Sequence, residues 1–148
     1  RRSLTSADPS NSEQTREFFE NVVSDDDGVN LLICVDGDDG EPEPVGDVAL
    51  FKIHDRTRWA EIAISIAPEH WGNGYGTEAS ELLVDYAFRE RNLHRLQARV
   101  IEPNDASASI WEKLGFTHEG TIRENQYYEG EYVGTRYYGL LEEEWEGR

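Results

Sequence analysis

The sequence has little of several residues that usually help to classify a protein. One cysteine, Cys34, occurs in 148 residues, so an internal disulfide is excluded and an exported, disulfide-stabilised scaffold is not expected. Methionine is absent, and lysine occurs only at positions 52 and 113. No apolar stretch approaches the roughly 18 residues of a membrane span, and the first residues lack the form of a signal peptide. We therefore expect a cytoplasmic protein without a membrane partner.

Positive charge is also scarce. The chain carries 31 acidic against 14 basic side chains, a formal net charge of −17. This surface would repel a phosphate backbone, so nucleic acid is not expected as a partner, whereas amines and other cations are. At about 1 M salt the Debye length falls to roughly 3 Å, which screens the repulsion between acidic groups. The composition therefore favours a halophilic protein from a salt-rich cytoplasm, with an acidic surface made for a basic partner as the alternative.

Patterning along the chain predicts the order of its elements within one folded domain. A capping box from Ser10 to Glu13, followed by phenylalanine and valine at helical spacing, predicts a first helix from Ser12 to Val23. Apolar runs predict the strands, and amphipathic stretches predict two further helices. In chain order these are strands at Val29–Val35, Val45–Ile53 and Trp59–Ile66, a helix at Thr77–Arg89, a strand at Leu93–Ile101, a helix at Asn104–Leu114, and closing strands at Phe116–Arg123 and Tyr132–Leu141.

One connection in this order requires a parallel step. The first three strands follow one another through turns and predict an antiparallel meander. The helix of residues 77–89 instead crosses over between the strands at 59–66 and 93–101, which places those two strands parallel. The predicted fold class is therefore α+β, with a mixed, mostly antiparallel sheet and helices on both faces.

A glycine-rich segment, Trp71–Thr77, lies directly before the crossover helix, with glycine at positions 72, 74 and 76. Glycine lets the backbone come close to a ligand, and a helix start presents N–H groups and the positive end of its dipole, so the segment suits an anion. It is not a Walker loop, since no Gly-Lys-Ser/Thr follows, and it lacks the Rossmann spacing. The alternative is a tight strand-to-helix turn that holds no ligand.

Three ordered groups of residues carry a resemblance to a known family. Residues 71–79 resemble the acetyl-CoA pyrophosphate loop of the GNAT-family N-acetyltransferases, and residues 104–107 with 112–116 resemble its second coenzyme segment. Residues 119–123, 138–141 and 144–145 resemble the branch that acetylates N-termini of ribosomal proteins. The resemblance covers roughly Val45 to Trp145 and implies a single acetyltransferase domain over residues 1–148. The family's first strand and helix are not evident before Ser10, so we expect the numbering to begin inside a longer chain.

The resemblance implies acetyl-CoA as cosubstrate, no metal, and a sheet that opens between the strands at 59–66 and 93–101 to take the pantetheine arm. Backbone groups of Ser65, Ile66 and Ala67 would pair with the pantetheine amides, with an N–H near Ile66 as oxyanion donor. The pyrophosphate would be held by Trp71, Gly72, Asn73, Gly74, Tyr75, Gly76 and Thr77. Asn104 and Ser107 would approach the thioester, and Lys113 would reach a phosphate or simply end an exposed helix.

Acetyl transfer to an amine also needs a base, because only the neutral amine attacks. Glu61 is the preferred candidate, since it lies in a strand on the side of Ala63 and Ser65; the alternative is an exposed carboxylate beside Arg58. Glu124 is a second candidate.

The departing thiolate needs a hydrogen-bond donor. Trp111 stands where many relatives have a tyrosine acid, and its indole cannot usefully protonate a thiolate. Ser107 is the candidate that hydrogen-bonds the sulfur, and it could also cap a helix of residues 107–114.

These features predict transfer of the acetyl group to a primary amine by direct attack. An α-amino group with a pKa of about 7.7 to 8.0 is roughly a tenth neutral at pH 7, against about one in 2,500 for lysine. Because the C-terminal third resembles the branch that acetylates ribosomal proteins and the α-amine is the easier nucleophile, a protein N-terminus is the first acceptor that we expect. Polyamines or aminoglycosides are alternatives, and Trp111 also permits a non-catalytic acyl-CoA-binding sensor. A cluster of five tyrosines predicts an acceptor wall, core contacts or a homodimer interface, at positions 127, 128, 132, 137 and 138. The four histidines show no metal-ligand spacing.

Overall fold

The computed structural model describes residues 2–5, 17–23 and 28–146. These residues form one sheet in the order β1-β2-β3-β4-β5-β6-β8-β7, whose neighbours are all antiparallel except β5 and β6. The strands are β1 (Arg2–Thr5), β2 (Glu17–Val23), β3 (Val29–Asp36), β4 (Pro42–His54), β5 (Trp59–Ile66), β6 (Arg95–Ile101), β7 (Thr117–Tyr128) and β8 (Glu131–Leu141). The helices are α1 (Tyr75–Arg89), α2 (Asp105–Lys113) and α3 (Glu142–Glu146), with a 3-10 turn, η2, at Pro68–His70. The predicted mixed, mostly antiparallel α+β sheet is confirmed.

The predicted first helix is wrong over its described part, because Glu17–Val23 is strand β2. Residues 12–16 of that prediction lie outside the described residues. Phenylalanine and valine favour strands as strongly as they fit helical spacing, and pairing decides between the two over so short a run. All seven residues of β2 pair with β3, and β1, which the sequence did not predict, pairs with β2 on the other side.

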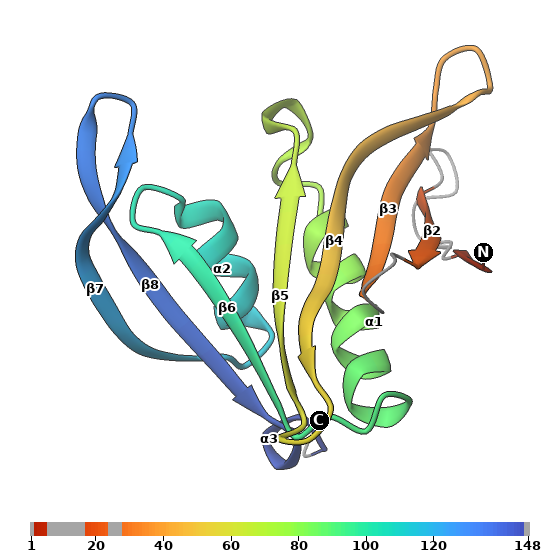
Figure 1. The fold of residues 1–148 in the computed structure, drawn as a ribbon. Helices are drawn as coiled ribbons and strands as arrows, with labels where there is room; N and C mark the ends of the chain where they lie inside the picture. The colour runs from red at the N-terminus through yellow and green to blue at the C-terminus, as the bar shows by residue number, and fades with distance from the viewer. Residues whose placement is uncertain (1, 6–16, 24–27, 147–148) are drawn as a thin grey trace.

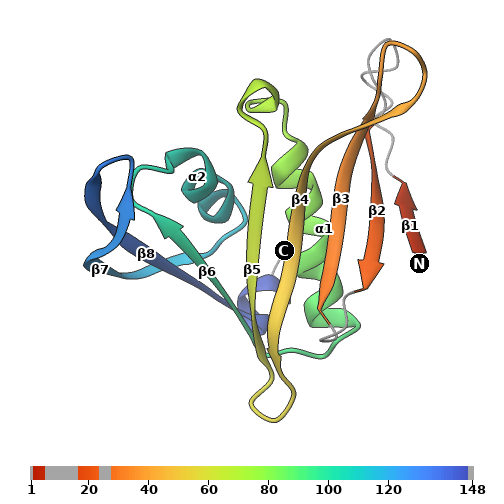
Figure 2. The same cartoon turned by 45° about the horizontal axis from the view of Figure 1, so that its top comes forward.

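Helices α1 and α2 lie on the same side of the sheet, behind it in Figure 1, and this is also visible in Figure 2. The prediction placed helices on both faces; these two described helices share one face because they pack against each other as well as on the strands. Gly76 permits this contact, since a Cβ atom there would lie 2.8 Å from Ile110 Cδ1 and 2.9 Å from Ile64 Cδ1. The apolar side of α1 faces the sheet through Ala79, Leu83, Val84, Ala87 and Phe88, all buried.

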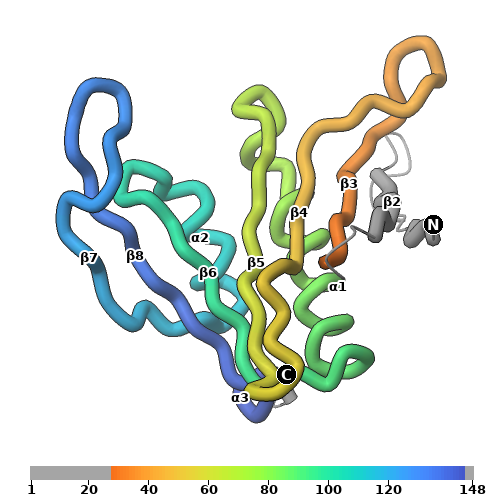
Figure 3. The backbone as a smooth tube through the Cα atoms, viewed as in Figure 1, coloured from red at the N-terminus to blue at the C-terminus, as the bar shows by residue number. Residues whose placement is uncertain are grey.

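The sheet opens between its two parallel strands, as predicted. Strands β5 and β6 pair only over Trp59–Glu61 and Arg95–Gln97 and then diverge, while β5 stays paired with β4 and β6 with β8. The resulting V is visible in Figures 1 and 3, where the β3–β4 hairpin, the end of β5 and the β7–β8 hairpin all reach toward its open end.

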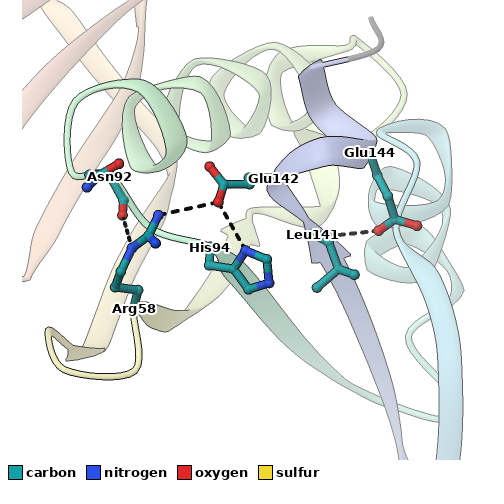
Figure 4. A network of polar contacts seen from close by, with 6 residues as sticks. All are labelled: Arg58, Asn92, His94, Leu141, Glu142 and Glu144. Atoms are coloured by element: carbon teal, nitrogen blue, oxygen red, sulfur yellow. Dashed lines mark hydrogen bonds and ion pairs between the residues drawn. The ribbon is translucent and has the colours of Figure 1, made fainter.

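A network of polar contacts ties the closed end of the V together (Figure 4). Arg58, in the turn between β4 and β5, donates from Nε to Asn92 O at 2.8 Å and from Nη2 to Glu142 Oε1 at 3.3 Å. His94 Nδ1 lies 3.0 Å from the same Glu142 oxygen. The hydrogen bond to His94 and the charge of Arg58 together lower the pKa of Glu142. The closed end therefore joins the β4–β5 turn, the segment before β6 and α3.

Candidate active site

The glycine loop is open and backbone-lined. Gly72 and Gly74 have φ angles of +83° and +81°, a left-handed conformation that glycine adopts without strain, and open space surrounds the position of a Cβ at both. Two hydrogen bonds attach the loop to the preceding turn η2. Trp71 N–H donates to Pro68 O at 3.2 Å, and Asn73 Nδ2 donates to His70 O at 3.1 Å. Among the described residues, no atom occupies the space where a side chain would stand at Gly72 or Gly74.

Helix α1 starts at Tyr75, two residues before the predicted start, with Gly74 as its N-cap and no side-chain cap. The bond from Glu78 N–H to Gly74 O, at 3.0 Å, begins the helical ladder. The N–H groups of Gly76 and Thr77 precede that ladder and point out of the helix end. Together with the helix dipole they form an environment for an anion.

A cavity of about 400 Å³ lies between this loop and α2. Its walls contain most of the predicted loop residues and four that were not proposed as site residues from the sequence, of which His70 and Ser109 are polar and Ala106 and Ile110 are apolar. The lining residues are Ile66, His70, Trp71, Gly72, Gly74, Tyr75, Gly76, Thr77, Ala106, Ser109, Ile110 and Lys113. Lys113 and His70 are the basic side chains among the lining residues, and none of the lining residues is acidic, although the chain as a whole is. The cavity therefore suits a ligand that carries phosphate.

A second cavity, of about 130 Å³, lies beside the first, between the end of β5 and the start of α2. It is lined by Ile64, Ser65, Ile66, Trp71, Asn104, Ala106, Ser107 and Ile110. Four of these residues also line the larger cavity: Ile66, Trp71, Ala106 and Ile110. The two cavities thus form a path from the glycine loop to the start of α2, and they bring Ser65 together with Asn104 and Ser107, which lie in a distant part of the sequence.

The backbone of β5 alternates between β4 and the gap. Ala67 N–H donates to Val45 O at 3.0 Å, and in an antiparallel pair the hydrogen-bonded positions recur at every second residue. Ser65 therefore points its backbone groups to β4, whereas Ile64 and Ile66 point theirs into the gap. Ile66 O accepts a hydrogen bond from Trp71 Nε1 at 2.8 Å. Of the predicted trio, Ile66 offers its backbone to the gap, Ser65 only lines the smaller cavity, and Ala67 lines neither cavity.

The start of α2 is capped by Asn104 and not by Ser107. Asn104 Oδ1 accepts a hydrogen bond from Ser107 N–H at 3.1 Å, and the helix begins at Asp105. The alternative in which Ser107 caps a helix of residues 107–114 is therefore wrong. Trp111 is 1% exposed and packs against Phe116 with ring centroids 5.1 Å apart, so it belongs to the core and lines neither cavity.

Glu61 lies where the V begins to open, but it is buried and ion-paired. Its Oε2 accepts from Arg99 Nε at 2.9 Å, and its Oε1 lies 3.5 Å from Lys52 Nζ. Burial disfavours the charged form of Arg99, but the charge and hydrogen bond of Glu61 outweigh this effect and raise the arginine's pKa. The alternative in which Glu61 is an exposed carboxylate beside Arg58 is wrong, because Glu61 is 5% exposed and Arg58 pairs with Glu142. Its part in catalysis stays a prediction.

Asp47 is a carboxylate near the site that the sequence analysis missed. It lies directly opposite Ser65 in the β4–β5 pairing, and Glu61 lies opposite Phe51 four residues further along β4. Asp47 is half-buried, and burial raises its pKa. In the orientation that satisfies its neighbours, the Asn30 amide donates to Asp47 Oδ2 at 3.0 Å. The alternation of β4, with Val48 and Leu50 in the core, was the signal that could have placed Asp47 on the opposite face.

The remaining candidates lie away from the two cavities. Tyr127, Tyr128 and Tyr132 are exposed on the β7–β8 hairpin, whereas Tyr138 is buried and donates to Glu112 Oε2 at 3.1 Å. Glu124 is exposed on β7. In the described part of the chain, no group of three or more His, Cys, Asp or Glu could hold a metal ion. None of the described helices is both long and apolar enough to cross a bilayer.

Comparison with known proteins assigns the family. Residues 1–117 match the model of the acetyltransferase (GNAT) domain. YdaF of Bacillus subtilis (strain 168), which carries the name of a proposed ribosomal N-acetyltransferase, is 32% identical over 143 residues, 94% of this chain and 75% of its own. The spermidine N(1)-acetyltransferase of Escherichia coli (strain K12) is 32% identical over 116 residues, 78% of this chain and 60% of its own. The chain belongs to the GNAT acetyltransferase family.

Solved structures agree with this assignment. The spermidine/spermine N-acetyltransferase SpeG of Vibrio cholerae, crystallised in mutant forms, superposes with a TM-score of 0.72 at 27% identity, over 85% of this chain and 74% of its own. Another structure of the spermidine N-acetyltransferase from that organism is described as dodecameric. The chain spans only 56% and 59% of the length of two further N-acetyltransferase relatives, YoaA of B. subtilis and p20 of Bacillus licheniformis.

Proposed function

We propose that the protein transfers the acetyl group of acetyl-CoA to a primary amine by direct attack, without a covalent enzyme intermediate. The observation that carries this proposal is the pair of adjacent cavities that leads from the glycine loop into the opened sheet. Acetyl-CoA supplies a phosphate-rich nucleotide, a long amide-bearing arm and a reactive thioester, in the order in which the cavities offer N–H donors, a strand edge and Ser107.

Each part of this path has groups that suit one part of the ligand. The N–H groups of Gly76 and Thr77 and the ammonium of Lys113 would hold the phosphates. The gap-facing backbone of Ile64 and Ile66 would pair with an extended amide chain, as an exposed strand edge does with a peptide. Ser107 lines the far cavity, where its hydroxyl would donate to the departing thiolate.

The acceptor would approach from the other face of the sheet, because α1 and α2 cover the side on which the cavities lie. That open face carries Glu61, Ala63 and Ser65 from β5, and Asp47 and Ala49 beside them on β4. The two alanines oppose each other and leave a shallow floor between the carboxylates of Glu61 and Asp47. Asp47 at one end of this apolar floor suits a cationic amine, whereas Glu61 at the other end is paired with Arg99 and Lys52.

A protein N-terminus is the acceptor that we propose first. The Glu61 carboxylate already contacts Arg99 and Lys52, so its oxygens are not free to act alone on an incoming amine. An α-amine is already partly neutral at pH 7 and needs little help from such a base, whereas lysine needs much more. The match to YdaF over 94% of the chain supports the same choice.

Two other functions have a specific observation in their favour. The similarity to spermidine acetyltransferases, with the strongly acidic composition, favours a polyamine acceptor. The burial of Trp111 in the position of the family's tyrosine acid favours a sensor that binds acyl-CoA without turnover.

One assay separates the three functions. Purified protein in about 2 M and about 0.2 M salt is mixed with acetyl-CoA and with a basic peptide bearing a free N-terminus, the same peptide with a blocked N-terminus, or spermidine, and thiol release is followed. We expect release with the free peptide, none with the blocked one, and higher activity in the concentrated salt. Faster release with spermidine would replace our acceptor, and acetyl-CoA binding without release from any amine would establish the sensor.

We also propose a homodimer through the β7–β8 hairpin. All twelve residues of β7 are exposed, the strand lies at the edge of the sheet, and Ile122 and Tyr127 expose 49% and 69% of their surface. Light scattering of the purified chain tests this: we expect a dimer that Tyr127→Glu converts to monomers, and a wild-type monomer would remove the proposal.

A further inference from the structure

Trp71 differs from the other tryptophans of the chain in its exposure. It is 54% exposed, whereas Trp111 and Trp145 are 1% and 4% exposed and Trp59 stacks on His54 with ring centroids 4.2 Å apart. An exposed indole in a loop usually has no fixed partner, yet this one folds back to β5 and donates from Nε1 to Ile66 O at 2.8 Å. The ring is therefore fixed in position by one hydrogen bond to the backbone.

The position of that bond matters, because Trp71 and Ile66 line both cavities. Ala106 and Ile110 on α2 also line both cavities, so the cavities meet between these two α2 residues on one side and Trp71 with Ile66 on the other. A ligand that extends from the glycine loop to Ser107 must pass the indole. The ring thus stands at the junction of the path and not at one of its ends.

The carbonyl that the indole holds is also the one that an incoming chain would use. Ile66 O points into the gap because the neighbouring Ala67 N–H is bonded to Val45 O on β4. An extended chain lying along β5 would donate an amide N–H to this carbonyl. The indole N–H is a donor only, so it stands in for such an amide.

We propose that Trp71 is a gate on the coenzyme path, which opens when an amide of the pantetheine arm replaces the indole N–H on the Ile66 carbonyl. One N–H···O hydrogen bond replaces another, so the free-energy change of the exchange is small and the exchange is reversible. The nucleotide part of the coenzyme, held by the glycine loop, reaches only the larger cavity and leaves the indole in place. This inference rests on acetyl-CoA as the ligand of the two cavities.

The test compares two ligands by tryptophan fluorescence and by calorimetry. CoA carries the arm, and 3′-phosphoadenosine 5′-diphosphate is its nucleotide part without the arm. We expect CoA to change the emission of the exposed Trp71, whereas the nucleotide binds by calorimetry without that change. Trp71→Phe should abolish the change in emission. Trp59→Phe is the matched control, at the start of β5 where that strand pairs with β6, and it should leave the change in emission intact.

Affinity gives a second readout. Trp71→Phe keeps a ring at the junction but removes the donor, so Ile66 O is free for the arm. We expect CoA to bind Trp71→Phe about 3- to 10-fold more tightly than wild type, with nucleotide affinity unchanged. Circular dichroism confirms that the variant is folded.

Three results would overturn the gate. An equal emission change with both ligands would mean that the indole contacts the nucleotide. No change with bound CoA would make the indole a fixed wall, and weaker CoA binding by Trp71→Phe would make it a direct ligand. If CoA binds neither wild type nor variant by calorimetry, the proposed function fails, and not only the gate.

Discussion

The two ends of the V formed by β5 and β6 differ in how their polar groups are used. At the closed end the strands pair over three positions each, and Arg58, His94 and Glu142 join the turns around them. At the open end, Ile64 and Ile66 turn backbone groups to the gap, and the glycine loop presents N–H groups with no side-chain cap. The closed end uses its hydrogen-bonding groups to hold the fold, and the open end keeps them available for a ligand.

The burial of charge follows the same division. Glu61, at the boundary, is neutralised by Arg99 and Lys52, whereas Asp47 has a raised pKa from burial and an amide as its partner. A carboxylate that builds the fold is thus paired with cations, and one beside the open cleft is left to meet a cation from outside.

Gly76→Val should disrupt the open end most. A Cβ there would lie under 3 Å from the Cδ1 atoms of Ile110 and Ile64, so a valine forces these side chains to rotate away or α1 to shift from α2 and β5. We expect a loss of about 3 kcal/mol in the free energy of unfolding, with loss of CoA binding. Denaturant unfolding and calorimetry measure both. Gly120→Ala, where a Cβ meets nothing within 4 Å, is the matched control and should be neutral; equal effects of the two variants would contradict the argument.

Glu61→Gln, at the point where β5 and β6 diverge, should lower stability and kcat but leave CoA affinity unchanged. Arg99 and Lys52 lose their anion, but they are 39% and 52% exposed and can be rehydrated, so the loss of stability should be only about 1 to 2 kcal/mol. We expect kcat with an amine to fall about 10-fold or more while CoA affinity stays the same, because Glu61 lines neither cavity.

A pH profile decides the role of Glu61. If kcat of Glu61→Gln matches wild type at every pH, then Glu61 is not the base. Glu124→Gln tests the second candidate in the same way, and the exposed Glu131→Gln serves as the control and should leave kcat unchanged.

Lys113→Gln tests whether the larger cavity at the open end binds phosphate through the charge of Lys113. Lys113 lines the larger cavity, so its removal should weaken CoA binding about 5-fold in dilute buffer and less in about 1 M salt, where charges are screened. Calorimetric titration at the two salt concentrations measures this. Arg56→Gln, an exposed change in the β4–β5 turn, should have no effect. A loss for Lys113→Gln that is equal in both salts would show that its role is packing and not charge.

Glu142→Gln should produce a small, pH-dependent effect at the closed end. The pKa of Glu142 is lowered in the folded chain, so its contribution to stability is present above the unfolded value of about 4.3 and is lost as the pH falls through the lower folded value. Between pH 7 and pH 3, the midpoint temperature of thermal unfolding should therefore fall more steeply for wild type than for the variant. The neighbouring Glu143→Gln should follow wild type, and parallel curves for Glu142→Gln would remove the assigned role.

Local sequence patterns predicted the positions of most strands and helices. Strand β5 has the predicted bounds, and the strands that became β6 and β8 differ by one or two residues, because alternation and turn residues act over short distances. The glycine loop was recognisable for the same reason. The pattern failed at Glu17–Val23, where the same phenylalanine and valine residues fit a helix or a strand and pairing with β3 decided the outcome.

The site was predictable as a set of residues but not as an arrangement. Ser107 was expected near the thioester end and lines the smaller cavity, yet the cap of α2 is Asn104. Glu61 was expected near the cleft, but its partners come from 9 and 38 residues away in the chain. Asp47 and His70 were missed, because each belongs to the site only through strand register or loop packing.

Local sequence patterns were enough to locate the strands and helices from β3 onward, the glycine turns and the strong negative charge, since these depend on each residue and its near neighbours; β1 and β2 depended on pairing. Only the tertiary structure decided which carboxylate is neutralised, which β5 groups face the gap and where the Trp71 indole lies. These properties depend on distances between residues far apart in the chain, and such distances exist only once the strands have paired.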